Sequence, residues 1–170
     1  MIYLSELLNR PVRDAENRKV GALRDLVVSL DSVFPRVAAA VVQAPGALPL
    51  GRENLLIPWS QITNLEEREI YLNVPQSRID AYLPREGELY LGRDILDKQI
   101  LDTQGRRIVK VNDLKLAQIK GAARLVGVDV SLAGFLRRLG MQGMQRLLPI
   151  KLPERLITWN YVERLEGEAS

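Results

Sequence analysis

The chain has 170 residues, of which 46% are hydrophobic and 26% charged, with a formal net charge of +3; this is the composition of an ordinary globular protein. It contains no cysteine and no histidine, which excludes disulfides, thiol nucleophiles, Cys/His zinc sites, histidine-ligated haem and proton transfer by histidine. The longest uncharged stretch, residues 37–51, is shorter than the roughly 20 residues of a membrane-spanning helix, and the N-terminus lacks the pattern of a signal peptide. We therefore expect a cytoplasmic protein.

The first half of the chain is typical of short strands separated by turns. Residues 5–8 predict one helical turn, Pro11 begins a strand, and the polar residues 14–18 have the chemistry to reverse it. The imperfect alternation after residue 19 indicates a strand that bends or bulges. Further strands are predicted over residues 19–30, 37–42, 55–57 and 70–74, with a single turn over 59–62 and a short helix over 75–83.

The second half repeats the first. Residues 12–20 return as residues 100–108, 88 positions later, and the pair Asp25-Leu26 returns as Asp113-Leu114. The segment around Trp59 returns around Trp159, now 100 positions later, so about 12 residues are inserted in the second copy. We predict two small domains, residues 1–83 and 88–170.

The insertion contains an amphipathic helix. Ser131 can cap it, and Leu132, Phe135, Leu136 and Leu139 follow the spacing of one helix face. Glycines 140 and 143 are expected to end it. Either the apolar face packs on its own domain, or the helix contacts a protein partner. The predicted contact residues are Phe135, Leu136, Arg137, Arg138, Leu139 and Arg146.

Several aligned residues have structural explanations. The aspartates suit turn caps or strand ends, where carboxylates accept backbone amide hydrogens; a pair of them in one pocket is the alternative, a Mg²⁺ site. Gly105 aligns with Asn17, which predicts a positive φ at both positions. The two tryptophans are expected to plug the core. The predicted structural residues are Asp14, Asp25, Trp59, Asp102, Gly105, Asp113 and Trp159. We predict no catalytic residue, metal site or cofactor, because no motif supports one.

The motif Val-x-Asp-x-x-(Gly/Asn)-x-x-(Val/Ile), followed by an Ile-Pro-Trp segment, resembles the PRC-barrel family, named for a barrel in the H subunit of photosynthetic reaction centres. Departures are Asn17 at the turn glycine, Val109 at a second glycine and Thr158 at the proline. The resemblance implies an all-β fold of two tandem small PRC-barrel-like β-barrels, with a short amphipathic helix inserted in the second. It is carried by Val12, Asp14, Val20, Gly21, Leu23, Asp25, Asp31 and residues 57–59, and by Ile100, Asp102, Gly105, Ile108, Val111, Asp113, Ile157 and Trp159.

Residues 126–129 and 136–140 resemble the cytoplasmic N-terminal region of bacterial proteins that continue into an MgtE-type magnesium-transporter intracellular domain and CBS domains. This resemblance implies a non-catalytic interaction or regulatory module. Its partner would be another protein or the downstream domains of the same longer chain. The strand at 70–74 should also recur at 170–174, so we expect the second unit to lack its closing strand and the chain to be the N-terminal part of a longer protein.

Two other functions stay open. A PRC-barrel also forms the C-terminal part of a bacterial ribosome-maturation factor, and an RNA-associated adaptor would suit the basic stretch from 104 to 155, which has 11 Lys/Arg against three acidic residues. RNA-stacking surfaces carry interleaved aromatic residues, however, and aromatics are only 5% of this chain. The third possibility is a homo-oligomerisation element that uses the open edge of the second barrel.

Overall fold

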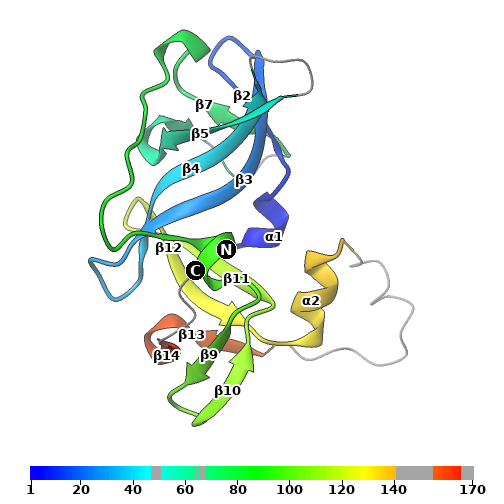
Figure 1. The fold of residues 1–170 in the computed structure, drawn as a ribbon, viewed down its shortest axis with the longest axis vertical. Coiled ribbons are helices and arrows are strands. Elements are labelled where there is room, and N and C mark those ends of the chain that lie inside the picture. Colours follow the sequence, from blue (N-terminus) through cyan, green and yellow to red (C-terminus); the bar gives the residue numbers. More distant parts are fainter. Residues whose placement is uncertain (47–50, 64, 66–67, 141–154, 166–170) are drawn as a thin grey trace.

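The computed structural model describes residues 1–46, 51–63, 65, 68–140 and 155–165. The protein is mostly β, with a few short helices, and its main sheet curls into a barrel-like shape (Figure 1). Within the described residues, eleven strands join this sheet and three form a second one. The predicted all-β, barrel-like fold is confirmed. No helix in the described part of the chain is long and apolar enough to cross a membrane.

The strands predicted for the first half are present, with small differences at their ends. The expected helix over 75–83 is instead a 3-10 turn at Gln76–Arg78, because the chain then runs extended and the amide of Tyr82 donates to the carbonyl of Leu56 at 3.0 Å. The elements are β1 (Ile2–Tyr3), α1 (Leu4–Leu7), β2 (Pro11–Arg13), β3 (Lys19–Ser29), β4 (Arg36–Pro45), β5 (Arg52–Pro58), a 3-10 turn (Trp59–Gln61), β6 (Ile62–Thr63) and β7 (Ile70–Leu72).

The two longest strands of the main sheet, β3 and β4, form a hairpin. The register of β3 shifts between Leu23 and Asp25 and again between Val27 and Val28, so the strand bends as its imperfect alternation predicted. Gly21 faces the backbone of β4, and a Cβ there would be 2.1 Å from the carbonyl oxygen of Gln43.

The second half begins with β8 (Leu89–Tyr90), which is followed by a π-helical turn at Leu91–Ile95 where the first half has α1. The strand that aligns with β3 is divided into β10 and β11. The remaining elements are β9 (Gln99–Asp102), β10 (Arg107–Lys110), β11 (Asp113–Ile119), β12 (Ala122–Asp129), α2 (Leu132–Arg138), β13 (Leu156–Thr158), a 3-10 turn (Trp159–Tyr161) and β14 (Val162–Arg164).

The two halves exchange their first strands. β1 pairs antiparallel with β11 of the second half, and β8 pairs antiparallel with β3 of the first half. The turns after β1 and β8 contribute buried side chains to one continuous apolar cluster that contains residues of both halves. The long curled sheet and this shared cluster therefore join the halves over a large interface. The buried side chains of the two turns are Leu4, Leu7, Leu91 and Ile95.

Backbone hydrogen bonds recur at residues 88 positions apart. The amide of Asn9 donates to the carbonyl of Leu23 at 2.8 Å, and that of Asp97 to the carbonyl of Val111 at 2.9 Å. Asn9 and Asp97 also share a positive φ, of 70° and 67° respectively. These positions therefore have matching backbone conformations in the two halves.

The edge of β9 differs from its counterpart in the first half. β2 pairs with β7 in a parallel orientation, and β6 lies beyond β7. β9, by contrast, pairs directly and antiparallel with β14. The strand edge for which the sequence predicted no partner is thus covered by the segment that follows Trp159.

Candidate functional site

Helix α2 forms where the sequence predicts the inserted helix. The hydroxyl oxygen of Ser131 accepts a hydrogen bond from the amide of Gly134 at 3.1 Å and caps the first turn. Asp129 fixes this cap, because its Oδ1 accepts from the amide and the hydroxyl of Ser131 at 2.9 and 2.5 Å. The helix ends at Arg138, and Gly140 follows with a φ of +72°. The second predicted terminating residue, Gly143, lies outside the described residues.

Arg137 attaches α2 to the sheet. Its Nε donates to Oδ2 of Asp113 at 3.0 Å and its Nη2 to Oδ2 of Asp129 at 2.6 Å. The Arg137 side chain is 11% exposed and both carboxylates are fully buried. The guanidinium also lies over the ring of Tyr3, 3.4 Å from its centroid. Burial alone would lower the pKa of Arg137, but its hydrogen bonds to the two carboxylates outweigh burial and raise the pKa.

The sequence prediction named Arg137 only as a partner-contact residue, whereas in the structure its guanidinium binds two buried carboxylates of the same chain. The helical periodicity correctly separates Arg137 from the apolar stripe, but it does not show that two buried carboxylates face it. Asp129 is the signal that was missed. It lies 88 positions after Val41, and a carboxylate at an aligned apolar position needs a buried cation. Arg137 follows it by eight residues and supplies that cation.

The N-terminal turn forms the other side of this cluster. The amide and hydroxyl of Ser5 donate to the two carboxylate oxygens of Asp113 at 3.2 and 2.5 Å. α2 is therefore linked through Asp113 to α1, although the two helices are far apart in sequence. Tyr3 and Ser5 were not predicted as site residues, because nothing in a local pattern indicates a contact over more than 100 positions.

The other predicted contact residues of α2 have different environments. Leu139 is 54% exposed, as is Leu132 at the start of the helix at 56%. Phe135 and Leu136 are half-buried. Arg138 forms an ion pair with Asp97 at the molecular surface. Arg146 lies outside the described residues. The outer surface of α2 thus combines two exposed leucines with a surface arginine.

Asp14 and Asp102 each cap a turn. Oδ1 of Asp14 accepts from the amides of Glu16 and Arg18 at 3.0 and 2.8 Å, and Oδ2 accepts from the amide of Gln76 at 2.9 Å. Burial alone would raise the pKa of Asp14, but these amides and the charge of Arg18 outweigh burial and lower it. The pKa of Asp102 is lowered chiefly by a hydrogen bond from the amide of Gly105.

Gly105 has a role other than the predicted one. The positive φ in its turn belongs to Arg106, at 51°, whereas in the first half it belongs to Asn17, at 64°. The turns differ because Asp102 pairs with Arg107 across the second hairpin, while Arg13 pairs with Lys19 across the first. A Cβ at Gly105 would lie 2.6 Å from Oδ2 of Asp102, so a glycine is needed there to make room for the carboxylate.

Asp25 lies at the aligned position of Asp113 and accepts two amide hydrogens from the opposite half of the chain and one from its neighbour in sequence. The amides of Gly92, Leu26 and Arg93 donate to it at 2.7, 2.7 and 3.1 Å. Burial nevertheless raises its pKa. Each of the predicted aspartates therefore accepts hydrogen bonds from backbone amides. Among the described residues, no three acidic side chains gather in an arrangement that could hold a metal ion.

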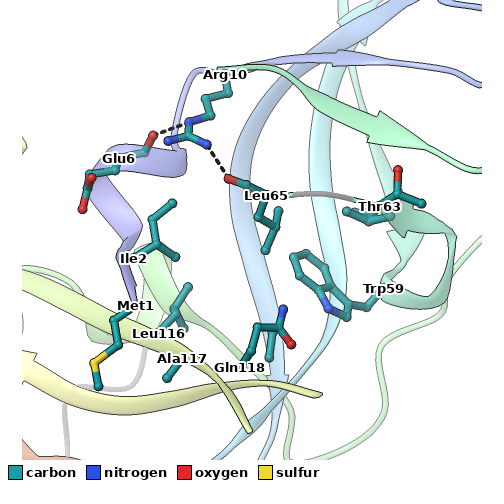
Figure 2. Close-up of a pocket in the computed structure, with 12 residues that line it drawn as sticks. Met1, Ile2, Glu6, Arg10, Trp59, Thr63, Leu65, Leu116, Ala117 and Gln118 are labelled. Carbon is teal, nitrogen blue, oxygen red and sulfur yellow. Dashed lines mark hydrogen bonds between the residues drawn. The ribbon is translucent and has the colours of Figure 1, made fainter. Parts of the chain in front are cut away.

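The two tryptophans are half-buried and pack against the shared apolar cluster from equivalent 3-10 turns. Trp59 also borders a groove of about 520 Å³, shown in Figure 2. The groove lies between the first and last strands of the eight-strand path of the main sheet, β1 and β6. Figure 2 shows Trp59 and Leu65 facing Ile2 and Leu116 across it.

The charged residues of the groove are engaged with the protein. Arg10 donates from Nε to the carbonyl of Glu6 and from Nη1 to the carbonyl of Leu65, both at 2.7 Å. The Glu6 carboxylate accepts from the amide of Tyr3 at 3.0 Å. The hydroxyl of Thr63 donates to the carbonyl of Tyr71 at 3.0 Å. These groups hold the walls in place, and their arrangement does not provide a nucleophile beside a base.

A comparison of the chain with known protein families finds a match, which lies in the first half of the chain. Residues 1–79 match the PRC-barrel domain. The match covers the elements from β1 to β7 and includes Asp14, Asp25 and Trp59. PRC-barrels are a family of non-enzymatic domains, which agrees with a site built from structural carboxylates and apolar surface. No curated protein matches the chain.

Proposed function

We propose that this protein is a non-catalytic interaction and regulatory module that presents α2 to a protein partner. The observation that carries the proposal is the attachment of α2 by a nearly buried arginine to two buried carboxylates. A helix held in this way loses little conformational freedom on binding, which favours association. Its outer surface carries the exposed side chains of Leu132 and Leu139, an apolar contact area that suits a partner groove.

We further propose that the chain consists of two PRC-barrel units, residues 1–83 and 88–170. The recurring hydrogen bonds of Asn9 and Asp97 support this organisation, as do the equivalent exchanges of β1 and β8. The exchange would make each unit depend on the first strand of the other. A double unit of this kind would form a rigid base for α2, the element that the second unit adds.

The partner that we propose is the intracellular part of a magnesium-transporter-like protein, as another polypeptide or as downstream domains of the same chain. The support is the sequence resemblance at residues 126–129 and 136–140. Both segments belong to the α2 site, since the first contains Asp129 and the second contains Arg137 and Leu139. A cytoplasmic location would follow from this partner.

RNA binding is less well supported by the positions of the basic residues. Arg137 is nearly buried, Arg138 pairs with Asp97, and Arg107 pairs with Asp102 at 3.5 Å. Arg124 donates to the Ser32 hydroxyl and the Phe34 carbonyl at 2.7 and 2.9 Å. Three of the eight Lys and Arg residues between 104 and 140 thus pair with carboxylates of the fold, which reduces the net positive charge that phosphate groups would meet.

The proposal is tested by site-specific photo-cross-linking in the native host. A photoreactive phenylalanine analogue is placed at Leu139, with a control at Ile108 on β10, because these side chains are 54% and 58% exposed. We expect cross-links from position 139 to intracellular residues of a magnesium-transporter-like protein, and none to these residues from position 108. Cross-links from 139 to ribosomal proteins or rRNA would support the ribosome-associated alternative instead.

A further inference from the structure

The edges of β2 and β9 provide a comparison within one molecule. In the first half, β7 lies between β2 and β6, with Val12 opposite Ile70 and Ile62 opposite Leu72. In the second half, β14 pairs with β9 directly, with Leu101 opposite Glu163. β6 and β14 both follow a 3-10 turn that begins with tryptophan. Within the described residues, the second half therefore has no strand between β9 and the strand after the tryptophan turn.

β14 forms backbone hydrogen bonds with β9 but contributes few buried apolar side chains. The amide of Thr103 donates to the carbonyl of Tyr161 at 2.9 Å, as the amide of Ala15 donates to that of Val74 at 3.0 Å. The side chains of the two strands differ. β7 buries both Ile70 and Leu72, whereas β14 has only a half-buried valine followed by two exposed charged residues. β14 thus leaves the apolar contacts of a strand such as β7 unmade.

The surroundings of β9 are basic. The hairpin of β9 and β10 carries exposed Arg106 and Lys110, and Lys98 precedes β9. This hairpin lies at the far end of the molecule from β2 and β7, where the sheet of β9, β10 and β14 is separate from the main sheet (Figure 1). A strand that joins this end would gain from an acidic residue beside its apolar side chains.

We propose that β9 accepts a strand of a partner protein on the side that β14 covers in this structure. An extended partner segment, with apolar residues at alternating positions and an acidic flank, pairs parallel to β9 as β7 pairs with β2. β14 then moves outward to the position that β6 has beside β7. This binding mode is β-strand addition, in which backbone hydrogen bonds supply affinity and the alternating side chains supply selectivity. It involves a surface other than the outer surface of α2 and does not depend on the partner proposed for that helix.

The probe is an acetylated and amidated synthetic peptide with the sequence of residues 69–74, Glu-Ile-Tyr-Leu-Asn-Val. It is added to the ¹⁵N-labelled full chain, and amide chemical shifts are followed by NMR. We expect saturable shifts at Ile100, Leu101 and Asp102 and at the amides of β14, and none of comparable size at Val12 and Arg13. A control peptide with aspartate in place of its isoleucine and leucine should produce no saturable shifts.

A pair of proline variants tests the displacement of β14. Since the amide of Thr103 bonds to Tyr161, the alternation of antiparallel pairs makes Glu163 and Leu101 the next hydrogen-bonded pair. Glu163→Pro removes a ladder hydrogen bond, whereas Arg164→Pro replaces an amide that points away from β9. We expect Glu163→Pro to bind the peptide about three- to tenfold more tightly than the natural chain, and Arg164→Pro to bind it unchanged.

Three results would overturn the proposal. One is the absence of saturable shifts at β9 in both the natural chain and Glu163→Pro, with retained folding shown by dispersed amide signals. The second is equal shifts at β2 and β9, which would indicate non-selective binding. The third is a mass in light scattering that doubles with concentration while the amides of β9 shift without peptide, because a second copy would then fill the edge.

Discussion

Asp113 on β11 accepts hydrogen bonds from the amide and hydroxyl of Ser5, 108 positions earlier in the chain. Asp25, its aligned counterpart on β3, accepts from the amide of Gly92 in the opposite half. Each carboxylate therefore holds the first turn of the other half of the chain. The two sites differ in one respect, since Arg137 and a second carboxylate, Asp129, complete only the site of Asp113.

This difference predicts unequal effects of removing the two aspartates. Asp113→Ala removes a hydrogen-bond acceptor of Arg137, which keeps Asp129, and the acceptor of the amide and hydroxyl of Ser5, so we expect it to lower the free energy of unfolding by about 3–5 kcal/mol. Asp25→Ala removes hydrogen bonds at a half-buried site and should cost about 1–3 kcal/mol. Urea unfolding at pH 7 measures both. Equal losses would show that the Arg137 cluster adds nothing to stability.

Arg137 and Arg138 are neighbours in sequence with different environments, so one serves as the control for the other. Arg137→Ala leaves two fully buried carboxylates without their cation and is expected to cost about 3–5 kcal/mol. Arg138→Ala removes a surface ion pair with Asp97 and should cost no more than about 1 kcal/mol. Hydrogen exchange of the α2 amides should rise strongly only in the first variant. Protection of α2 that survives Arg137→Ala would mean that its apolar contacts alone hold the helix.

The lowered pKa values of Asp14 and Asp102 predict a loss of stability in acid. A carboxyl group with a lower pKa in the folded state contributes stability above its unfolded pKa of about 3.9, and this contribution disappears as the pH falls through the folded value. Asp14→Asn should therefore be less stable at pH 7 and should lose less stability between pH 5 and pH 2. Thermal unfolding across this range tests the slope, and an unchanged slope in the variant contradicts the assignment.

Asp25 should act in the opposite direction. Its raised pKa means that the folded chain favours the protonated carboxyl, so this group stabilises the fold below its unfolded pKa, and that contribution is lost as the pH rises through the folded value. The fall in stability on acidification should consequently be steeper in Asp25→Asn than in the natural chain. A shallower fall would show that the pKa of Asp25 is lowered.

Tyr82 provides a spectroscopic test of the linker between the halves. Burial and hydrogen bonds to both carboxylate oxygens of Glu88, at 2.8 and 2.7 Å, raise the pKa of Tyr82 to about 12. The tyrosinate absorbance of the natural chain and of Tyr82→Phe is measured as a function of pH, and the second curve is subtracted from the first. The difference, which reports Tyr82 alone, should show no ionisation of this phenol near pH 10. Glu88→Gln should move its ionisation to lower pH. A difference spectrum that titrates near pH 10 in the natural chain would mean that the linker does not enclose Tyr82.

Local sequence patterns predicted the parts of the fold that depend on neighbouring residues. Ser131 and the spacing of leucines indicated α2, and the turn chemistry of Asp14 agrees with its hydrogen bonds to the amides at 16 and 18. The role of Gly105 was wrong, because it depends on the room taken by the Asp102 side chain and not on the φ of the glycine. Steric demands of this kind appear only in three dimensions.

The sequence did not predict which strands pair over long distances along the chain. The strands β1 and β8 begin the two halves of the chain, but each pairs with the opposite half. An alignment gives equivalence and not contact, so it cannot distinguish pairing within a unit from pairing between units. The carboxylate partners of Arg137 were missed for the same reason, since Asp113 and Asp129 lie on strands whose position relative to the helix is set by tertiary packing.

Affinity for a partner is the most direct test of the interaction module. Binding of the purified natural chain to the partner protein that cross-links to position 139 is compared with binding of Leu139→Ser and of Ile108→Ser by calorimetry. Removal of a large apolar contact at an interface costs about 1–3 kcal/mol, so we predict that Leu139→Ser weakens binding by about tenfold or more while Ile108→Ser leaves it unchanged. Equal affinities of the three chains would contradict the role of α2.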